Sequence, residues 1–157
     1  MRVHVVSDVH GAALALSRAA EGADMFVCLG DLILFLDYDD PSRGIFADLF
    51  GEEYARAYIE ARTANRFDEA RDLSAAAWRQ RGVIDPDQRR SVMLAMVRTQ
   101  YEELFDAMPS PALLTYGNVD IPTLWPDYLR EGHTVLDGTV PEVGGMRGGF
   151  VGGGLVS

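Results

Sequence analysis

The chain has 157 residues, enough for one domain with a hydrophobic core, and 48% hydrophobic with 24% charged residues is typical of globular proteins. The net charge of −10 argues against nucleic acid as a bulk electrostatic partner, and no apolar run is long enough to predict a membrane span. A single cysteine, Cys28, and the lack of a signal-peptide pattern predict a cytoplasmic protein.

The first thirty residues predict a β-α-β unit. A valine-rich strand is expected at residues 2–7, a helix at 11–22 and a second apolar strand at 25–29. Two parallel strands joined by a helix are typical of open α/β sheets. In such sheets ligands bind at the carboxyl ends of the strands.

A helical insertion is predicted over about 41–108, where Ala, Arg, Glu and Leu dominate and β-branched residues are few. Turn signals such as Gly51 and Gly82 divide it into four expected helices, at 42–50, 52–65, 67–81 and 86–108. Two interpretations stay open: a structural helical layer, or a cap beside the site that shapes substrate access.

Strand patterns return after the insertion. A short helix is expected at 122–129, with Pro122 near its start and Asp120 as a possible cap. A strand pair is expected within 144–154. The other expected strands lie at 112–116, 133–136, 139–143 and 149–151.

Three of the predicted strands end in loops with metal-ligand side chains: Asp8 and His10 in the first, Asp31 after Gly30 in the second, and Asn118 in the third. A carboxylate with an imidazole suits Mn, Fe or Zn, and one carboxylate can bridge two ions. Each loop alone is weak evidence. Their order along three strand ends predicts one shared metal site.

The segments SDVHG, LGD and YGNVD resemble the first three signature blocks of the calcineurin-like metallophosphoesterase superfamily. The resemblance implies an α/β fold, a four-layer α/β/β/α sandwich, with residues 1–157 as the N-terminal part of one domain. It also implies hydrolysis of a small phosphomonoester or phosphodiester by a hydroxide that bridges two divalent ions. Asp8 and His10 would bind the first ion, Asp31 would bridge both, and Asn118 would bind the second. Asp31 and Asn118 would also be catalytic.

The chain departs from this pattern in two ways. Val119 stands where many members have a histidine that assists the leaving group, which makes a helix cap the expected role of Asp120. The last two blocks, an isolated histidine and G-H-x-H, do not follow, and His4 and His133 are expected to be structural. We therefore expect a truncated chain with weak metal binding, little or no hydrolysis, and self-association through an exposed sheet.

Two other functions remain open from the sequence. One is a non-catalytic protein-interaction scaffold of the same fold, or an inactive fragment. The other is a nucleotide-binding α/β domain, which is disfavoured because neither G-x-G-x-x-G nor G-x-x-x-x-G-K-[ST] occurs.

Overall fold

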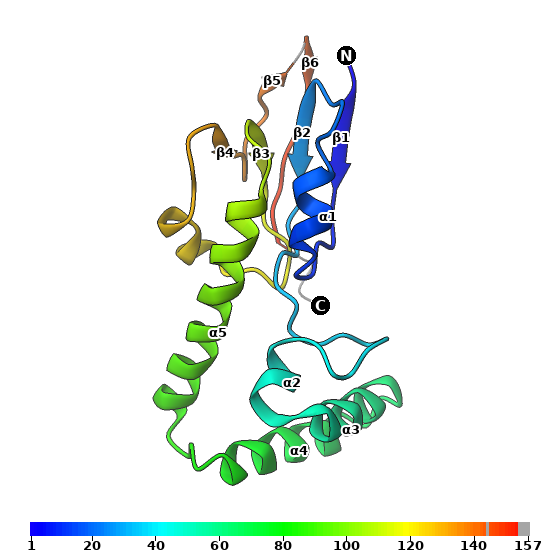
Figure 1. Ribbon diagram of the computed structural model, residues 1–157, viewed down its shortest axis with the longest axis vertical. Helices are drawn as coiled ribbons and strands as arrows, with labels where there is room; N and C mark the ends of the chain where they lie inside the picture. Colours follow the sequence, from blue (N-terminus) through cyan, green and yellow to red (C-terminus); the bar gives the residue numbers. More distant parts are fainter. Residues whose placement is uncertain (144, 154–157) are drawn as a thin grey trace. The chain divides into compact units, whose positions relative to one another are not determined.

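The computed structural model describes residues 1–143 and 145–153 of the chain. These residues form two compact units. Figure 1 shows the chain coloured by residue number. The first unit combines Met1–Ile33 with Thr99–Ser157, and the second is Leu34–Arg98. Each unit is described separately below.

The first unit contains a four-stranded parallel sheet (Figure 1). Its strands are β1 (Val3–Val6), β2 (Met25–Cys28), β3 (Ala112–Leu114) and β4 (His133–Val135), in that order across the sheet. Helix α1 (Ala13–Arg18) joins β1 to β2. The α/β class predicted from the sequence is confirmed, and each of these strands is shorter than its predicted range.

Burial explains why β2 lies inside the sheet. Phe26, Val27 and Cys28 are all buried, which suits a strand with neighbours on both sides. Burial also raises the pKa of the Cys28 thiol to about 11, so this thiol is a packing residue rather than a reactive one. A second part of the core is aromatic, with the Phe105 and Trp125 rings 5.4 Å apart.

The helix expected at 122–129 is a 3-10 helix, η1 (Pro122–Asp127). Pro126 lies inside it and has no backbone N–H to donate, which prevents a regular α-helical ladder.

Beyond η1 and β4 the strands are short. Strands β5 (Glu142–Val143) and β6 (Met146–Arg147) form an antiparallel hairpin, next to a single bridge between Thr139 and Phe150. Strand β6 lies within residues 144–154, where the sequence predicted a strand pair. Of the strand pair expected within 144–154, residues 144 and 154 lie outside the described part of the chain.

The second unit is helical. Its helices are α2 (Ile45–Phe50), α3 (Glu52–Thr63), α4 (Phe67–Gln80) and the first part of α5 (Pro86–Ala107). All four predicted helices are confirmed, with ends within three residues of the predicted ones. Helix α2 begins late because Gly44 has φ 97°, outside the helical region.

Aromatic contacts hold the helical unit together. The buried Phe46 ring lies 4.7 Å from the Tyr58 ring and 4.8 Å from the Phe50 ring, and Phe50 in turn contacts Trp78. Within the described residues, none of the helices has the length and apolar character to cross a membrane.

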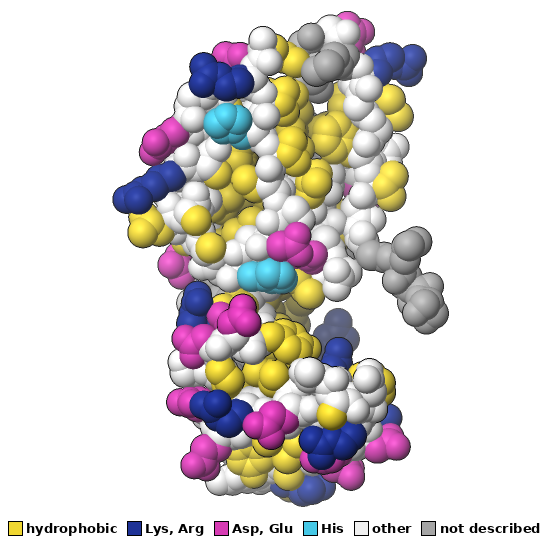
Figure 2. Space-filling model, turned by 90° about the vertical axis from the view of Figure 1, so that its right-hand side faces the viewer, with side chains coloured by type: hydrophobic (Ala, Val, Ile, Leu, Met, Phe, Trp, Pro, Cys, Tyr) yellow, Lys and Arg dark blue, Asp and Glu magenta, His cyan; other side chains and the backbone are white. Residues whose placement is uncertain are grey.

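Some large hydrophobic side chains remain at the surface, where Figure 2 shows yellow areas between charged groups. In the first unit they include Val5 on β1 and Leu14 on α1, and in the second Ile84. Self-association through an exposed sheet stays a prediction.

Candidate functional site

The loops that follow β1 and β2 are tied together by backbone hydrogen bonds. The His10 amide donates to the Asp31 carbonyl and the Gly11 amide donates to the Leu32 carbonyl, both at 2.9 Å. Two predicted ligand loops therefore run side by side at the carboxyl end of the sheet, where α/β proteins place their ligands.

The backbone at three predicted ligands is left-handed. Asp8, His10 and Asp31 have φ of 53°, 42° and 51°, a region that non-glycine residues rarely enter. In the described part of the chain only one other non-glycine residue has positive φ, Asn65. Asn65 directly follows the C-cap of α3, where asparagine commonly ends a helix, so its conformation has a local explanation. Asp8, His10 and Asp31 do not follow a helix end, so their left-handed conformation has no such local explanation.

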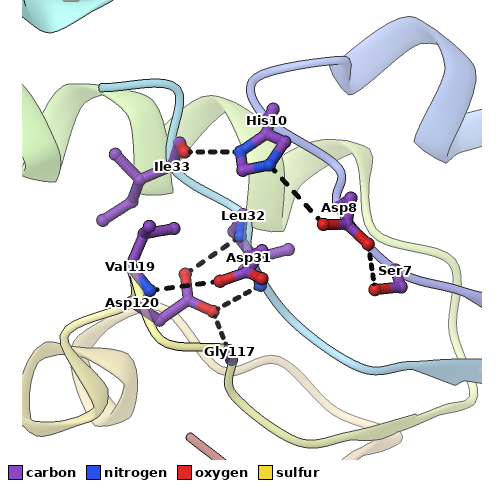
Figure 3. A network of polar contacts seen from close by, with 9 residues as sticks. All are labelled: Ser7, Asp8, His10, Asp31, Leu32, Ile33, Gly117, Val119 and Asp120. Carbon is purple, nitrogen blue, oxygen red and sulfur yellow. Dashed lines mark hydrogen bonds and ion pairs between the residues drawn. The ribbon is translucent and has the colours of Figure 1, made fainter. Parts of the chain in front are cut away.

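His10 and Asp8 face each other. Figure 3 shows the His10 ring between the Ile33 carbonyl and the Asp8 carboxylate. His10 Nδ1 lies 3.0 Å from the Ile33 carbonyl, which can only accept, so Nδ1 carries a proton in this contact. On the other side of the ring, Nε2 faces Asp8 Oδ1 at 3.8 Å. The Ser7 hydroxyl orients the same carboxylate by donating to Asp8 Oδ2 at 2.5 Å.

Asp31 and Asp120 connect the second and third loops (Figure 3). Asp31 Oδ1 accepts the Val119 amide at 3.1 Å. Asp120 accepts the amides of Asp31 at 2.8 Å, Leu32 at 3.0 Å and Gly117 at 2.9 Å. Asp31 of the second loop thus accepts an amide of the third loop, and Asp120 of the third loop accepts amides of the second. Each carboxylate therefore ties the two loops together.

The predicted cap role of Asp120 is wrong. The N-cap of η1 is Ile121, and it has no side-chain cap. The Asp120 carboxylate is turned instead toward loop amides close to 90 residues earlier in the chain. Burial raises the pKa of Asp120, as does the nearby Asp31 charge, while the three amides lower it.

Glycines allow this close approach of the two loops. A Cβ on Gly30, where φ is 90°, would lie 2.1 Å from the Gly117 nitrogen. A Cβ on Gly117 would lie equally close to Asp31 Oδ1. No larger residue fits either position without moving the backbone of the site.

Asn118 is exposed and lines a cavity of about 360 Å³. Asp31 and Ser7 line the same cavity, and residues of the 149–153 segment form another part of its wall. Asp8 and His10 are not among the lining residues. The structure therefore divides the predicted ligands into an Asp8–His10 pair and an Asp31–Asn118 pair joined by the β2 loop.

Asp8 and His10 have the donor chemistry and spacing to share an ion. Among the described residues, however, no three His, Cys, Asp or Glu side chains gather closely enough to form a complete metal site. The other two histidines lie elsewhere: His4 Nδ1 contacts the Ala19 carbonyl at 2.8 Å, and His133 begins β4.

Sequence reasoning missed Tyr101 as a site residue. Its hydroxyl accepts the Ile121 amide at 2.7 Å and lies 3.4 Å from Asp120 Oδ1, so it supports Asp120 from α5. Burial raises the pKa of Tyr101, which keeps the hydroxyl protonated. The sequence around Tyr101 contains no signal for this contact.

The chain was compared with protein-family models, with curated proteins and with solved structures, and no match was found in any of the three.

Proposed function

We propose that this chain is a metal-dependent phosphoesterase of the calcineurin-like type, acting on a small phosphomonoester or phosphodiester. The observation that carries the proposal is the left-handed backbone at Asp8, His10 and Asp31. Each such residue costs about 1–3 kcal/mol, and strain of this kind concentrates at functional sites. The three positions are those that the sequence pattern assigns to metal ligands.

Asp8 and His10 would hold the first ion. The 3.8 Å between Asp8 Oδ1 and His10 Nε2 is slightly wider than the separation of two ligand atoms about 2.0–2.2 Å from one tetrahedral ion, so the two side chains would close on the ion by a few tenths of an ångström. The Ile33 carbonyl fixes the ring tautomer that leaves Nε2 available, a common device at metal sites. Bound divalent ions would supply an activated water and neutralise charge on the phosphoryl oxygens.

Asp31 and Asn118 would act on the second ion and the substrate. Asp31 uses one oxygen for the Val119 amide, and its second oxygen is available to a shared ion. Asn118 offers an amide oxygen at the wall of the cavity of about 360 Å³. This cavity would receive the phosphate group of the substrate. The Val119 side chain cannot protonate a leaving group, so substrates with good leaving groups are favoured.

The four-layer α/β/β/α sandwich is part of the same proposal. In a four-layer sandwich the parallel sheet would form one β-layer, and the hairpin of β5 and β6 would belong to the other. A reducing cytoplasm suits the chain, because its one cysteine is buried as a free thiol.

Manganese binding tests the first-ion site directly. We expect the purified chain to bind Mn(II) by calorimetry or electron paramagnetic resonance, and Asp8→Asn and His10→Gln each to weaken binding at least about 10-fold. His4→Gln is the matched control, since His4 lies within β1 and its Nδ1 contacts the Ala19 carbonyl. Equal binding in all four proteins would overturn the assignment of these ligands.

Activity is measured separately, with bis-p-nitrophenyl phosphate and p-nitrophenyl phosphate in the presence of Mn(II). We expect hydrolysis by a form extended through a G-H-x-H segment, and a loss of at least about 100-fold in Asp31→Asn. Hydrolysis that does not change in Asp31→Asn would count against the proposal.

A non-catalytic scaffold of the same fold, or an inactive fragment, is the second candidate. It is favoured by one observation, the absence of a three-residue metal group among the described residues. Metal content after purification separates the candidates: tightly bound metal near one equivalent supports the enzyme, and none supports the scaffold or fragment.

A further inference from the structure

The helical unit contains a cavity of about 470 Å³ that the phosphoesterase proposal does not use. Helices α3, α4 and the start of α5 line it. Its volume falls within the range of about 300–1,000 Å³ usual for small-molecule sites. The side chains that give it chemical character are Tyr58, Arg62, Phe67, Arg71, Trp78 and Arg89.

The cavity is basic in an acidic protein. Three arginines line it and no Asp or Glu does, although the chain has 24 acidic and 14 basic residues. Within the described chain, no carboxylate lies within 4.0 Å of Arg62 or Arg89. Arg71 has a partner in Asp68 at 3.1 Å, but both side chains are largely exposed, so this pair is weak. The arrangement leaves a local excess of positive charge.

Two of the guanidinium groups are held in place by aromatic rings. Arg62 lies over the Phe67 ring at 5.7 Å from its centroid, and Arg89 lies over the Trp78 ring at 5.8 Å. Arg89 Nε also donates to the Val83 carbonyl at 2.9 Å, which directs its terminal nitrogens to other partners. Such ordered guanidinium groups lose little freedom on binding an anion.

The aromatic walls indicate the rest of the ligand. Phe67 is 53% exposed, unusual for so large an apolar side chain, although it begins α4 beside the cavity. A planar ring in the cavity would cover it and could stack against Phe67 or the guanidinium planes. Ser74 and Tyr58 add hydroxyl groups for hydrogen bonds.

We propose that this cavity binds a small aromatic compound that carries a phosphate group, of the size and chemistry of a nucleoside monophosphate. Three guanidinium groups suit a phosphate dianion better than they suit a single carboxylate, because each can form paired hydrogen bonds to phosphate oxygens. The proposal does not depend on the metal site, since every residue that carries it lies within Leu34–Arg98.

Calorimetric titration of the full chain with adenosine monophosphate tests the proposal, with a chelator present so that a metal site cannot contribute. We expect saturable binding that is weakened at least about 10-fold in Arg62→Gln and in Arg89→Gln. Arg56→Gln is the matched control, because Arg56 is also on α3 but pairs with Glu52 outside the cavity. His10→Gln should bind as the wild type does.

Further titrations identify which part of the ligand is recognised. Adenosine and inorganic phosphate should each bind at least about 10-fold more weakly than adenosine monophosphate. Binding of adenosine as tight as the nucleotide would overturn the role of the arginines, and tighter binding of a phosphotyrosine peptide would overturn the small-molecule assignment. No binding, or equal loss in Arg56→Gln, would overturn the site itself. Quenching of Trp78 fluorescence by adenosine monophosphate, in variants that remain folded, provides an independent measurement of binding.

Discussion

The Asp120 carboxylate accepts backbone amides from two separate loops, those of Asp31, Leu32 and Gly117. The local sequence does not indicate this role, because an Asp two residues before Pro122 has the pattern of a helix start. The donors from the β2 loop are 88 and 89 residues away in sequence. A contact of such range depends on strand order, which a local pattern does not contain.

Replacement of Asp120 by Asn separates the loop-positioning role from a cap role. Asn keeps one accepting oxygen, but its NH2 group must face a backbone amide that also donates, so the substitution should lower the free energy of unfolding by about 2–4 kcal/mol. Urea unfolding at neutral pH measures the change. Asp68→Asn removes the same charge from an exposed pair and should change stability by less than about 0.5 kcal/mol.

A cap role predicts a different result. Asn and Asp are nearly equivalent N-caps, so a capping Asp120 would tolerate the substitution with little loss. Equal stability of Asp120→Asn and the wild type would contradict the positioning role that the hydrogen bonds assign.

At the scale of elements, the sequence predicted most of the fold because hydrophobic periodicity and turn residues are local signals. The helices of the second unit and the first three strands are found where the pattern placed them. Strand β6 lies inside the strand pair expected at 144–154, but its ends could not be predicted, because two residues between glycines have no periodicity to detect. For the site, the sequence indicated Asp8, His10, Asp31 and Asn118. It could not show that Asn118 lines the cavity of about 360 Å³ while His10 does not.

The turn that leads into β4 depends on a histidine. The His133 amide donates to the Arg130 carbonyl at 3.0 Å, and the Arg130 amide donates to His133 Nδ1 at 3.2 Å. Nδ1 can accept this bond only without a proton. Burial lowers the pKa of His133, and the Arg130 charge lowers it further, while the carbonyls of Pro109 and Met108 oppose the shift.

This lowered pKa predicts a pH-dependent stability. The unfolded His133, with a pKa of about 6.5, binds a proton more readily than the folded one. Its contribution to stability is therefore complete above about pH 6.5 and is lost as the pH falls toward the folded pKa. Urea midpoints at about pH 7.5 and pH 5.5 should differ less in His133→Gln than in the wild type. His4→Gln should keep the wild-type difference, and an unchanged difference in His133→Gln would refute the assignment.

At the scale of the whole molecule, each compact unit has its own aromatic core and its own tryptophan. Trp125 belongs to the first unit, with Phe105 as a neighbour, and Trp78 belongs to the second, with Phe50 as a neighbour. The chain contains no other tryptophan. Fluorescence can therefore follow each unit alone, in Trp125→Phe for the helical unit and in Trp78→Phe for the sheet unit.

Phe46→Ala should destabilise the helical unit selectively. Phe46 is 2% exposed and contacts Phe50, which contacts Trp78, so truncation should cost about 3–5 kcal/mol. We expect the urea midpoint reported by Trp78 to fall more than the midpoint reported by Trp125, because the second unit has its own core. Phe67→Ala, the same change at an exposed ring of the same unit, should shift either midpoint little. Equal shifts at both tryptophans in Phe46→Ala would mean that the two units unfold as one cooperative body.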